Sequence, residues 1–208
     1  MPRVLEKVER RLGEKLFLKG ERCLGPKCAY VRRSQPPGMH GKSRRRRRDS
    51  SEYGSLLKEK MKMRYYYGLD DGAVKRYVGK AVSKRGIFHT TMFQLLERRL
   101  DSAVFRIGFT ASRAQARQAI SHGHININNR RVRIPSYELK VGDTISIRSS
   151  SAGSALFGEL HNRLRSWEPP RWLTLNKETP SATVVGLPEL EQTVLTLDAT
   201  KVKEFYSR

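Results

Sequence analysis

The apolar positions in the middle of the chain recur at the spacing of a helix. They are Phe93, Leu96, Leu100, Val104 and Ile107. Intervals of 3, 4, 4 and 3 residues place these side chains on one face of an α-helix. Gly108 follows, and glycine is the usual residue just beyond a helix C-terminus. The pattern therefore predicts one continuous helix. Three basic residues fall largely off its apolar face: Arg98, Arg99 and Arg106.

After Gly108 the period of the apolar positions changes from that of a helix to that of strands. Ser112–Gln115 has the sequence of a capping box and starts a second helix, which Gly123 ends. Alternation of apolar and polar residues then predicts strands. The apolar members are Ile125, Ile127, Val132 and Ile134, followed by Ile145 and Ile147. Asn128-Asn129 supplies a hairpin turn, because Asn tolerates positive φ. Residues 92–150 are thus predicted to form a module of two helices and a short antiparallel sheet.

Two more helices are predicted before this module. The first begins near residue 51 or 53 and runs to Tyr67, and the second runs over residues 71–84. Three consecutive tyrosines, at 65 to 67, end the first helix. Aromatic rings stack on bases in some RNA-binding proteins, but packing at a helix end is their commoner role. We expect packing here.

The chain is strongly basic. Its 208 residues include 42 Lys and Arg against 20 Asp and Glu, a formal net charge of +22. Such a charge favours a polyanionic partner, nucleic acid first and an anionic membrane surface second. The membrane is the poorer choice, because no apolar stretch reaches the ~18 residues of a spanning helix. The first residues also lack the apolar run of a secretory signal, and two cysteines make no disulfide framework. We therefore expect a reduced, cytoplasmic protein.

The charge is concentrated in residues 22–48, which carry ten positive side chains and no acid. Prolines and glycines interrupt any long helix there, and five adjacent arginines, Arg44 to Arg48, repel one another in water. We expect residues 1–50 to form an extended basic arm that orders against phosphates. The alternative is a disordered basic tail or a nuclear localisation run. Residues 161–208, with seven positive and six negative charges, are instead expected to pack on protein.

Several segments of the chain match a known pattern. In the module they are Leu95–Phe109, Ser112–Gln118, His122–Ile125 and Pro135–Tyr137. Outside it they are Leu16–Gly20, Pro36–Gly41, Tyr53-Gly54 with Lys58–Lys60, Trp172-Leu173 and Glu204–Arg208. In this order, these segments resemble the bacterial ribosomal small-subunit protein four family. Because the match covers nearly the whole chain, it is far more specific than the module alone.

The resemblance implies a structural protein of the small ribosomal subunit and no enzyme. Such a protein binds 16S ribosomal RNA early, nucleates assembly and contributes to translational accuracy. Further implied partners are small-subunit protein five and messenger RNA near its entry site, which the arginine run faces. The implied fold is α+β: a helical lobe of residues 51–91, the inserted module 92–150, and a C-terminal segment 151–208 that packs back on the lobe.

The resemblance and the basic residues of the arm, helices and hairpin together give a set of expected RNA contacts. Four arginines are expected to clamp phosphates: Arg113, Arg117, Arg130 and Arg131. The remaining expected contacts are Arg44, Arg45, Arg46, Arg47, Arg48, Tyr53, Lys58, Lys60, Lys62, Arg64 and His122.

Two other classes of protein share some of these features. Arg99-Leu100-Asp101 matches the tripeptide that carries the catalytic aspartate of many pseudouridine synthases, so an RNA-modifying enzyme is the alternative function. We interpret Asp101 as a helix-surface acid instead, since the chain leaves no room for a separate catalytic domain. A DNA-binding regulator is a third candidate, because two helices and a turn are typical of that class.

Cys23 and Cys28 are candidate metal ligands, but a structural zinc site needs four ligands. In family members that bind zinc, two more cysteines lie upstream, at places taken here by Glu6 and Glu9. His40 is a candidate third ligand, and the sequence offers no good fourth. We therefore expect buried, reduced thiols, folding without zinc, and no cofactor.

Overall fold

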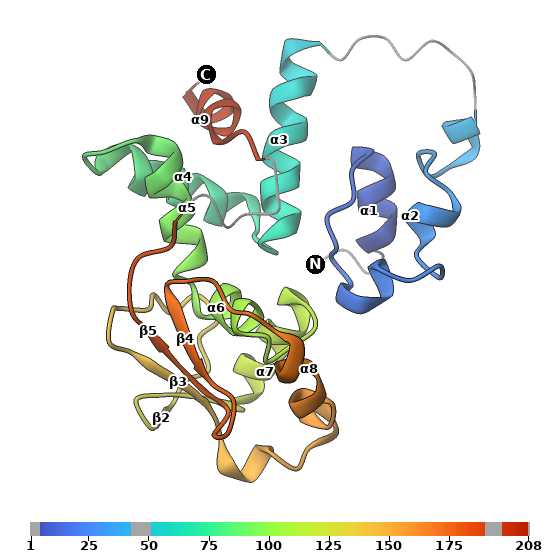
Figure 1. The fold of residues 1–208 in the computed structure, drawn as a ribbon. Coiled ribbons are helices and arrows are strands. Elements are labelled where there is room, and N and C mark those ends of the chain that lie inside the picture. The colour runs from blue at the N-terminus through green and yellow to red at the C-terminus, as the bar shows by residue number, and fades with distance from the viewer. Residues whose placement is uncertain (1–4, 43–50, 190–196, 208) are drawn as a thin grey trace. The chain divides into compact units, whose positions relative to one another are not determined.

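The computed structural model describes residues 5–42, 51–189 and 197–207 (Figure 1). Within these ranges the elements follow the order α1 (Leu5–Leu12), η1 (Gly20–Cys23), α2 (Ala29–Arg32), η2 (Met39–Lys42), α3 (Glu52–Tyr66), α4 (Asp71–Ser83), α5 (Phe88–Glu97), α6 (Leu100–Ile107), α7 (Arg113–His122), β1 (Ile125–Ile127), β2 (Arg130–Arg131), β3 (Thr144–Ile147), η3 (Ser149–Ser151), η4 (Ala155–Phe157), α8 (Leu160–Ser166), β4 (Leu173–Asn176), β5 (Ser181–Val184) and α9 (Ala199–Ser207). Every helix in this part of the chain falls short of the length or the hydropathy that crossing a bilayer demands.

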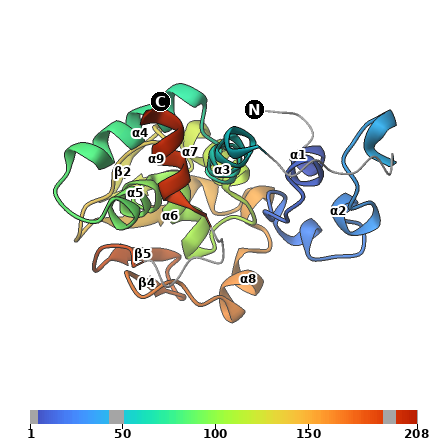
Figure 2. The ribbon, with the colours of Figure 1, turned by 90° about the horizontal axis from the view of Figure 1, so that it is seen from above.

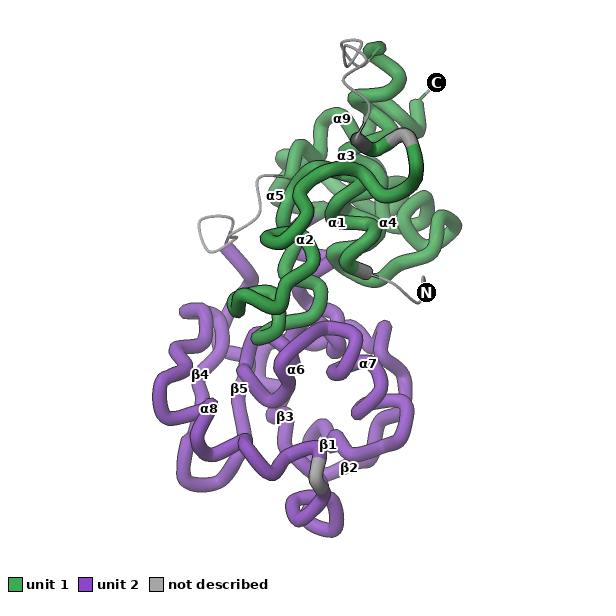
Figure 3. Tube along the Cα trace, turned by 90° about the vertical axis from the view of Figure 1, so that its right-hand side faces the viewer, with its two compact units in different colours: residues 1–92, 193–208 green, residues 93–192 purple. Residues whose placement is uncertain are grey.

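The chain divides into two compact units (Figure 3). Unit 1 consists of residues 1–92 and 193–208, and unit 2 consists of residues 93–192. The described part of unit 1 is helical, whereas unit 2 combines helices with an antiparallel sheet. This arrangement confirms the expected α+β class.

The N-terminal segment, which we define as residues 5–42, is folded. A small apolar cluster packs it against α3 and contains Val8, Leu12, Leu16, Met61 and Tyr65. Lys58 and Lys62 of α3 form ion pairs with Glu14 of this segment, at 3.0 and 2.6 Å. The expectation of an extended arm is therefore wrong for residues 5–42, because their apolar side chains find a helix to pack on. The run Arg44 to Arg48 lies outside the described residues.

Helices α3 and α4 have the extents that the sequence predicts. The Ser51 side chain accepts a hydrogen bond from the Gly54 amide at the start of α3, and Asp70 accepts one from the Ala73 amide at the start of α4. Such caps satisfy amides that have no partner within the helix. Helix α9 lies beside α3 in both views of the ribbon (Figures 1 and 2), with the Phe205 ring 5.8 Å from the Tyr53 ring.

The sheet of unit 2 is larger than the sequence predicts. Its strands follow the order β2-β1-β3-β5-β4, and every neighbouring pair is antiparallel. Strand β3 pairs with β1 on one side and with β5 on the other, where Ile145 stands opposite Ala182. Residues 151–192 therefore belong with the module, and the expected boundary at residue 150 is wrong. We expected the whole C-terminal segment to return to the helical lobe. In the described structure, α9 is the part of this segment that does so.

The predicted single helix over residues 93–107 is two helices, α5 and α6. Arg99 is extended, with ψ at 140°. The Leu100 and Asp101 amides, which begin α6, donate to the carbonyls of Tyr137 and Pro135 instead of to carbonyls one turn back. Periodicity alone does not show this break, because hydrogen bonds from a distant segment replace those of the helix.

The hairpin between β1 and β2 turns at Asn128-Asn129, as predicted. Both residues have positive φ, 48° and 62°, which suits the right-handed twist of the strands. Gly123, with φ at 76°, ends α7 in the left-handed conformation. The positive φ favours glycine, and a Cβ at this position would also force the Arg131 guanidinium to move.

Candidate RNA interface

Unit 2 contains two groups of arginines in different surroundings. The helix-pair arginines lie on or beside α6 and α7 and are Arg99, Arg106, Arg113 and Arg117. The hairpin arginines lie on or near the ends of β1, β2 and β3 and are Arg130, Arg131, Arg133 and Arg148. The two groups differ in whether a buried carboxylate faces them.

Glu97, at the end of α5, holds two of the helix-pair arginines. Its carboxylate is 1% exposed and accepts hydrogen bonds from Nε and Nη2 of Arg106 at 2.8 and 3.0 Å. It also accepts one from Arg113 Nη2 at 3.1 Å, and the Arg113 guanidinium lies 4.7 Å from the centre of the Phe105 ring. Arg113, an expected phosphate clamp, is thus largely taken up inside the fold.

Asp101 holds the other two helix-pair arginines. It is 3% exposed and binds Arg99 in a bidentate manner, at 3.0 and 2.6 Å. Arg117 Nε lies 4.0 Å from the same carboxylate and its side chain is 33% exposed. The interpretation of Asp101 as a surface acid is therefore wrong. A buried, doubly hydrogen-bonded carboxylate is also unsuited to attack a base, which removes the tripeptide's support for an enzyme.

The hairpin arginines have a different environment. Arg130, Arg131 and Arg133 are exposed and Arg148 is half-buried. The ion pairs of unit 2 involve other arginines, and among the described residues no carboxylate pairs with these four.

Arg131 also has a structural task. Its guanidinium donates to the carbonyls of His122 and Gly123, at 2.9 and 3.1 Å, where α7 ends. A cation there interacts favourably with the helix dipole. Desolvation, and then repulsion from Arg133 and Arg148, lowers the pKa of Arg131 from its ordinary value. Hydrogen bonds from the Val132 amide to the Ile125 carbonyl and from the Arg148 amide to the His124 carbonyl place Arg133 and Arg148 on either side of the start of β1. Clustered basic residues on one surface are the charge pattern of a phosphate-binding site.

Two of the hairpin arginines were missing from the expected contacts. Arg133 follows Arg131 by two residues, and in extended backbone this spacing puts both on one face, a signal that the sequence did offer. Arg148 had no such signal. It joins the group because its amide donates to the His124 carbonyl beside the start of β1, a pairing between segments distant in sequence.

The expected contacts on α3 are mostly engaged within unit 1. Lys62 is 5% exposed and pairs with Glu14 and Glu59, both at 2.6 Å. Lys60 pairs with Asp71 at 3.0 Å and lies 4.5 Å from the centre of the Phe205 ring. Two further expected residues are more open: the Lys58 side chain is 41% exposed and Tyr53 is 54% exposed. Arg64 lies 3.9 Å from Asp71.

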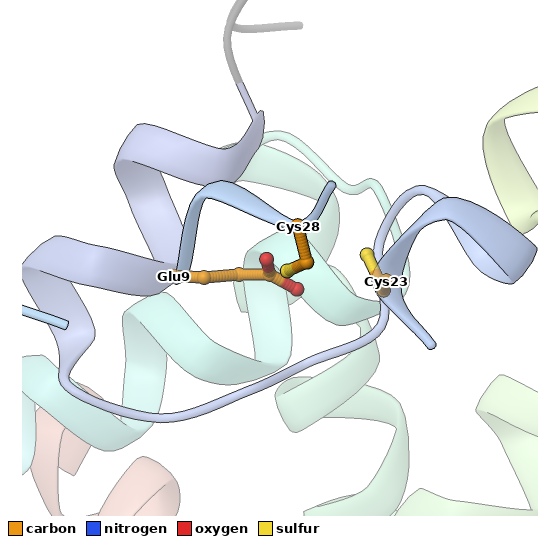
Figure 4. Close-up of side chains that lie close together, drawn as sticks. All are labelled: Glu9, Cys23 and Cys28. Carbon is orange, nitrogen blue, oxygen red and sulfur yellow. The ribbon is translucent and has the colours of Figure 1, made fainter. Parts of the chain in front are cut away.

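The candidate metal ligands form a compact buried cluster (Figure 4). Glu9, Cys23 and Cys28 each offer one ligand atom, and these atoms lie within 4.8 Å of one another. Both cysteines are free thiols. Burial, then the Glu9 and Cys28 side chains, raises the pKa of Cys23 against the opposing effect of the Lys19 amide. The side chain of His40 lies outside the described part of the structure.

The chain matches known proteins over nearly all of its length. Residues 98–145 match the family described as S4 domain, and residues 5–97 match that described as ribosomal protein S4/S9 N-terminal domain. Small ribosomal subunit protein uS4 of Syntrophomonas wolfei is 44% identical over 96% of this chain and 94% of its own length. The same protein of Halothermothrix orenii is also 44% identical, and that of Acetivibrio thermocellus 43%, with the same coverage. The chain belongs to the ribosomal protein S4 family.

Membership in the S4 family establishes the broad role of the chain. It is a structural protein of the small subunit of the cytoplasmic ribosome, with an RNA-binding S4 domain, and it is not an enzyme. The matched S4 domain contains α6, α7 and the hairpin. Three of the hairpin arginines, Arg130, Arg131 and Arg133, lie within the residues that match the S4 domain.

Proposed function

We propose that this protein binds 16S ribosomal RNA directly and that the hairpin arginines supply phosphate contacts. The observation that carries the proposal is a set of exposed or half-buried arginines at the hairpin and at the end of β3 with which no described carboxylate forms an ion pair, in a chain whose net charge is +22. Double-stranded RNA hides its base edges in a deep, narrow groove, so proteins recognise it through phosphates and 2′-hydroxyls. Arginine suits this task, because its planar fork donates two parallel hydrogen bonds to one phosphate.

The expected contacts divide according to their surroundings. Arg117, Arg130, Arg131 and His122 are at least partly exposed, and with Arg133 and Arg148 they form the proposed surface of unit 2. Arg113, Lys60 and Lys62 are assigned a supporting role, since their charges are met inside the fold. Tyr53, Lys58 and Arg64 are proposed as additional contacts from unit 1.

The finer roles rest on the resemblance of the chain to its family. We propose that early 16S RNA binding nucleates assembly of the small subunit, and that the protein contributes to translational accuracy together with small-subunit protein five. The run from Arg44 to Arg48 is proposed to face messenger RNA near its entry site. A segment with five adjacent arginines favours phosphate contacts without base readout.

The test is direct binding of the full chain to the 5′ part of 16S RNA, followed by chemical probing and a salt titration. Replacing Arg130, Arg133 and Arg148 by alanine should remove protections and reduce the steepness of the salt dependence. Each lost phosphate contact lowers the magnitude of the slope of log K against log salt by about 0.7 to 0.9. The slope of the triple variant should therefore be smaller in magnitude by roughly 2 to 3. Arg131 is kept, because it also caps α7.

A matched control removes the same charge elsewhere. Lys75, Arg76 and Lys84 are exposed residues on and just after α4, and their replacement by alanine should leave the protections of the hairpin arginines in place. Equal losses of slope and protection in both variants would mean that net charge alone, and not this surface, binds the RNA. Normal RNA protection with the first variant would also contradict the proposal.

A further inference from the structure

The cluster of Glu9, Cys23 and Cys28 does not fit a closed structural metal site. Such a site needs four ligands in tetrahedral arrangement, and the residues that the structure describes offer three. The next carboxylate along α1, Glu6, is already compensated by Arg22 Nε at 3.1 Å and Lys19 Nζ at 3.6 Å. Two cations thus stand beside this nearby carboxylate, and they disfavour a further dication there.

The Glu9 carboxylate already performs a task that a metal ion performs in small modules. It is 0% exposed, and its Oε1 accepts hydrogen bonds from the Leu16 and Leu18 amides, both at 3.1 Å. Through these bonds one side chain of α1 holds the loop that follows the helix. Hydrogen bonds to a charged acceptor are among the stronger ones in proteins, and buried amides without them are costly.

The Glu9 carboxylate also lies close to the thiols. One of its oxygens and the two sulfur atoms lie within 4.8 Å of one another, and Figure 4 shows the carboxylate end of Glu9 beside Cys28. Its second oxygen, Oε2, is buried and makes no conventional hydrogen bond within the described part of the chain. A thiol S–H is a weak donor. The thiols can therefore reduce the free-energy cost of burying this oxygen without being essential to it. Cys23 Sγ also accepts a hydrogen bond from the Lys19 amide at 3.4 Å.

We propose that Glu9 organises the N-terminal segment in place of a metal ion, and that Cys23 and Cys28 act as replaceable packing residues around its carboxylate. The proposal concerns the folding of unit 1 and does not depend on the RNA contacts proposed above. In a thiolate metal site the cysteines would matter most for folding; the proposal predicts that Glu9 matters more than the cysteines. The carboxylate is necessary and the thiols are not.

The first experiment measures amide hydrogen exchange in the full chain. In Glu9→Ala, protection of the Leu16 and Leu18 amides should fall by roughly 10- to 100-fold, the equivalent of losing a hydrogen bond to a charged group. Glu9→Gln should restore part of the protection, because its amide oxygen still accepts. A Cys23→Ser/Cys28→Ser double variant should keep it, since a serine hydroxyl donates to Oε2 at least as well as a thiol. Glu21→Gln, at an exposed position of η1, is the matched control.

The second experiment measures zinc bound after dialysis of the purified chain against zinc and then against buffer. The natural sequence and Cys23→Ser/Cys28→Ser should hold no stoichiometric zinc, whereas Glu6→Cys/Glu9→Cys should hold about one ion per chain, because it supplies four thiolates. Stoichiometric zinc in the natural sequence, with loss of Leu16 and Leu18 protection on chelation, would overturn the proposal. So would a serine double variant as unprotected as Glu9→Ala. Should Glu9→Ala fail to fold, Glu9→Gln and the serine double variant still decide the matter.

Discussion

The helix-pair arginines and the hairpin arginines are the same residue type in one unit of the protein, yet they do opposite work. In the helix pair, Glu97 and Asp101 are almost fully buried and draw four guanidinium groups toward the interior. At the hairpin, no described carboxylate forms an ion pair with the arginines, and desolvation, then repulsion from Arg133 and Arg148, lowers the pKa of Arg131. The position of a buried acid therefore decides whether an arginine stabilises the fold or remains available to bind a polyanion.

The difference has an energetic basis. A buried charge is tolerated only when a partner compensates it, and removing that partner leaves an unpaired ion in a medium of low polarity. An exposed arginine has water as its alternative partner, so its removal costs the fold little. Stability should consequently depend on the acids of the helix pair, and RNA affinity on the arginines of the hairpin.

The largest effect is expected from Glu97→Ala. This change leaves Arg106 and Arg113 without their buried partner, and we expect a loss of about 3 to 5 kcal/mol in the free energy of unfolding of unit 2. Urea denaturation, followed by the fluorescence of Trp167 and Trp172, both in unit 2, measures it. As the contrasting variant, Arg130→Ala/Arg133→Ala should change stability by less than about 0.5 kcal/mol. Similar losses in both variants would abolish the distinction between the two groups.

An intermediate effect is expected at Arg131, which is a hairpin arginine but also caps the end of α7. Gly123→Ala should cost about 2 to 3 kcal/mol, because it adds overlap with the Arg131 guanidinium to the strain of a left-handed residue. Gly142→Ala is the matched change: Gly142 also has positive φ, at 92°, but open space where the Cβ would lie. It should cost about 1 to 2 kcal/mol, the backbone strain alone. Equal losses on thermal denaturation would mean that packing of Arg131 on the helix end contributes nothing.

The smallest effect tests the same contrast in unit 1, where Glu14 meets Lys58 and Lys62. Burial by itself would raise the pKa of Glu14, but hydrogen bonds from Lys62 and Lys58 outweigh it, and the pKa lies below its ordinary value of 4.5. A lowered acid pKa stabilises the fold above the unfolded value, and that contribution is lost as the pH falls below it. Because the Glu14 side chain is 38% exposed, the effect should stay below about 1 kcal/mol after screening.

The measurement for this last prediction is urea denaturation of the natural chain and Glu14→Gln as a function of pH. The difference in stability should be present near neutral pH, shrink as the pH drops below about 4.5, and diminish with added salt. A difference that persists unchanged in strong acid would show that the glutamine change acts through packing and not through charge.

Local patterns in the sequence predict much of this fold. The caps at Ser51, Asp70 and Ser112 and the turn at Asn128-Asn129 depend on side chains acting on backbone within a few residues, so they can be recognised without the rest of the chain. Long-range pairing cannot be recognised in this way. The attachment of β5 to β3 depends on strands about 35 residues apart, and neither strand's own sequence specifies its partner.

The candidate site shows the same limit. Basic residues of the hairpin are recognisable as a group because they are neighbours in the sequence, and Arg130 and Arg131 were expected as contacts. Glu97, Asp101 and Lys62 look like solvent-facing charges at helical spacing, because their burial is created by segments that pair with them from elsewhere in the chain. Resemblance to a family supplied the function, and it did not supply these internal ion pairs.

The placement of α9 on α3 has a consequence for the order in which the protein is made. All of residues 93–192 are translated after α3 and before α9, so unit 2 can complete its sheet while the α9-binding face of α3 is still uncovered. At ordinary rates of synthesis this interval is on the order of ten seconds. For that time the aromatic and lysine side chains that later meet Phe205 and Tyr206 are open to chaperones or to nascent ribosomal RNA. Closure of unit 1 is thereby delayed until the translating ribosome has released α9.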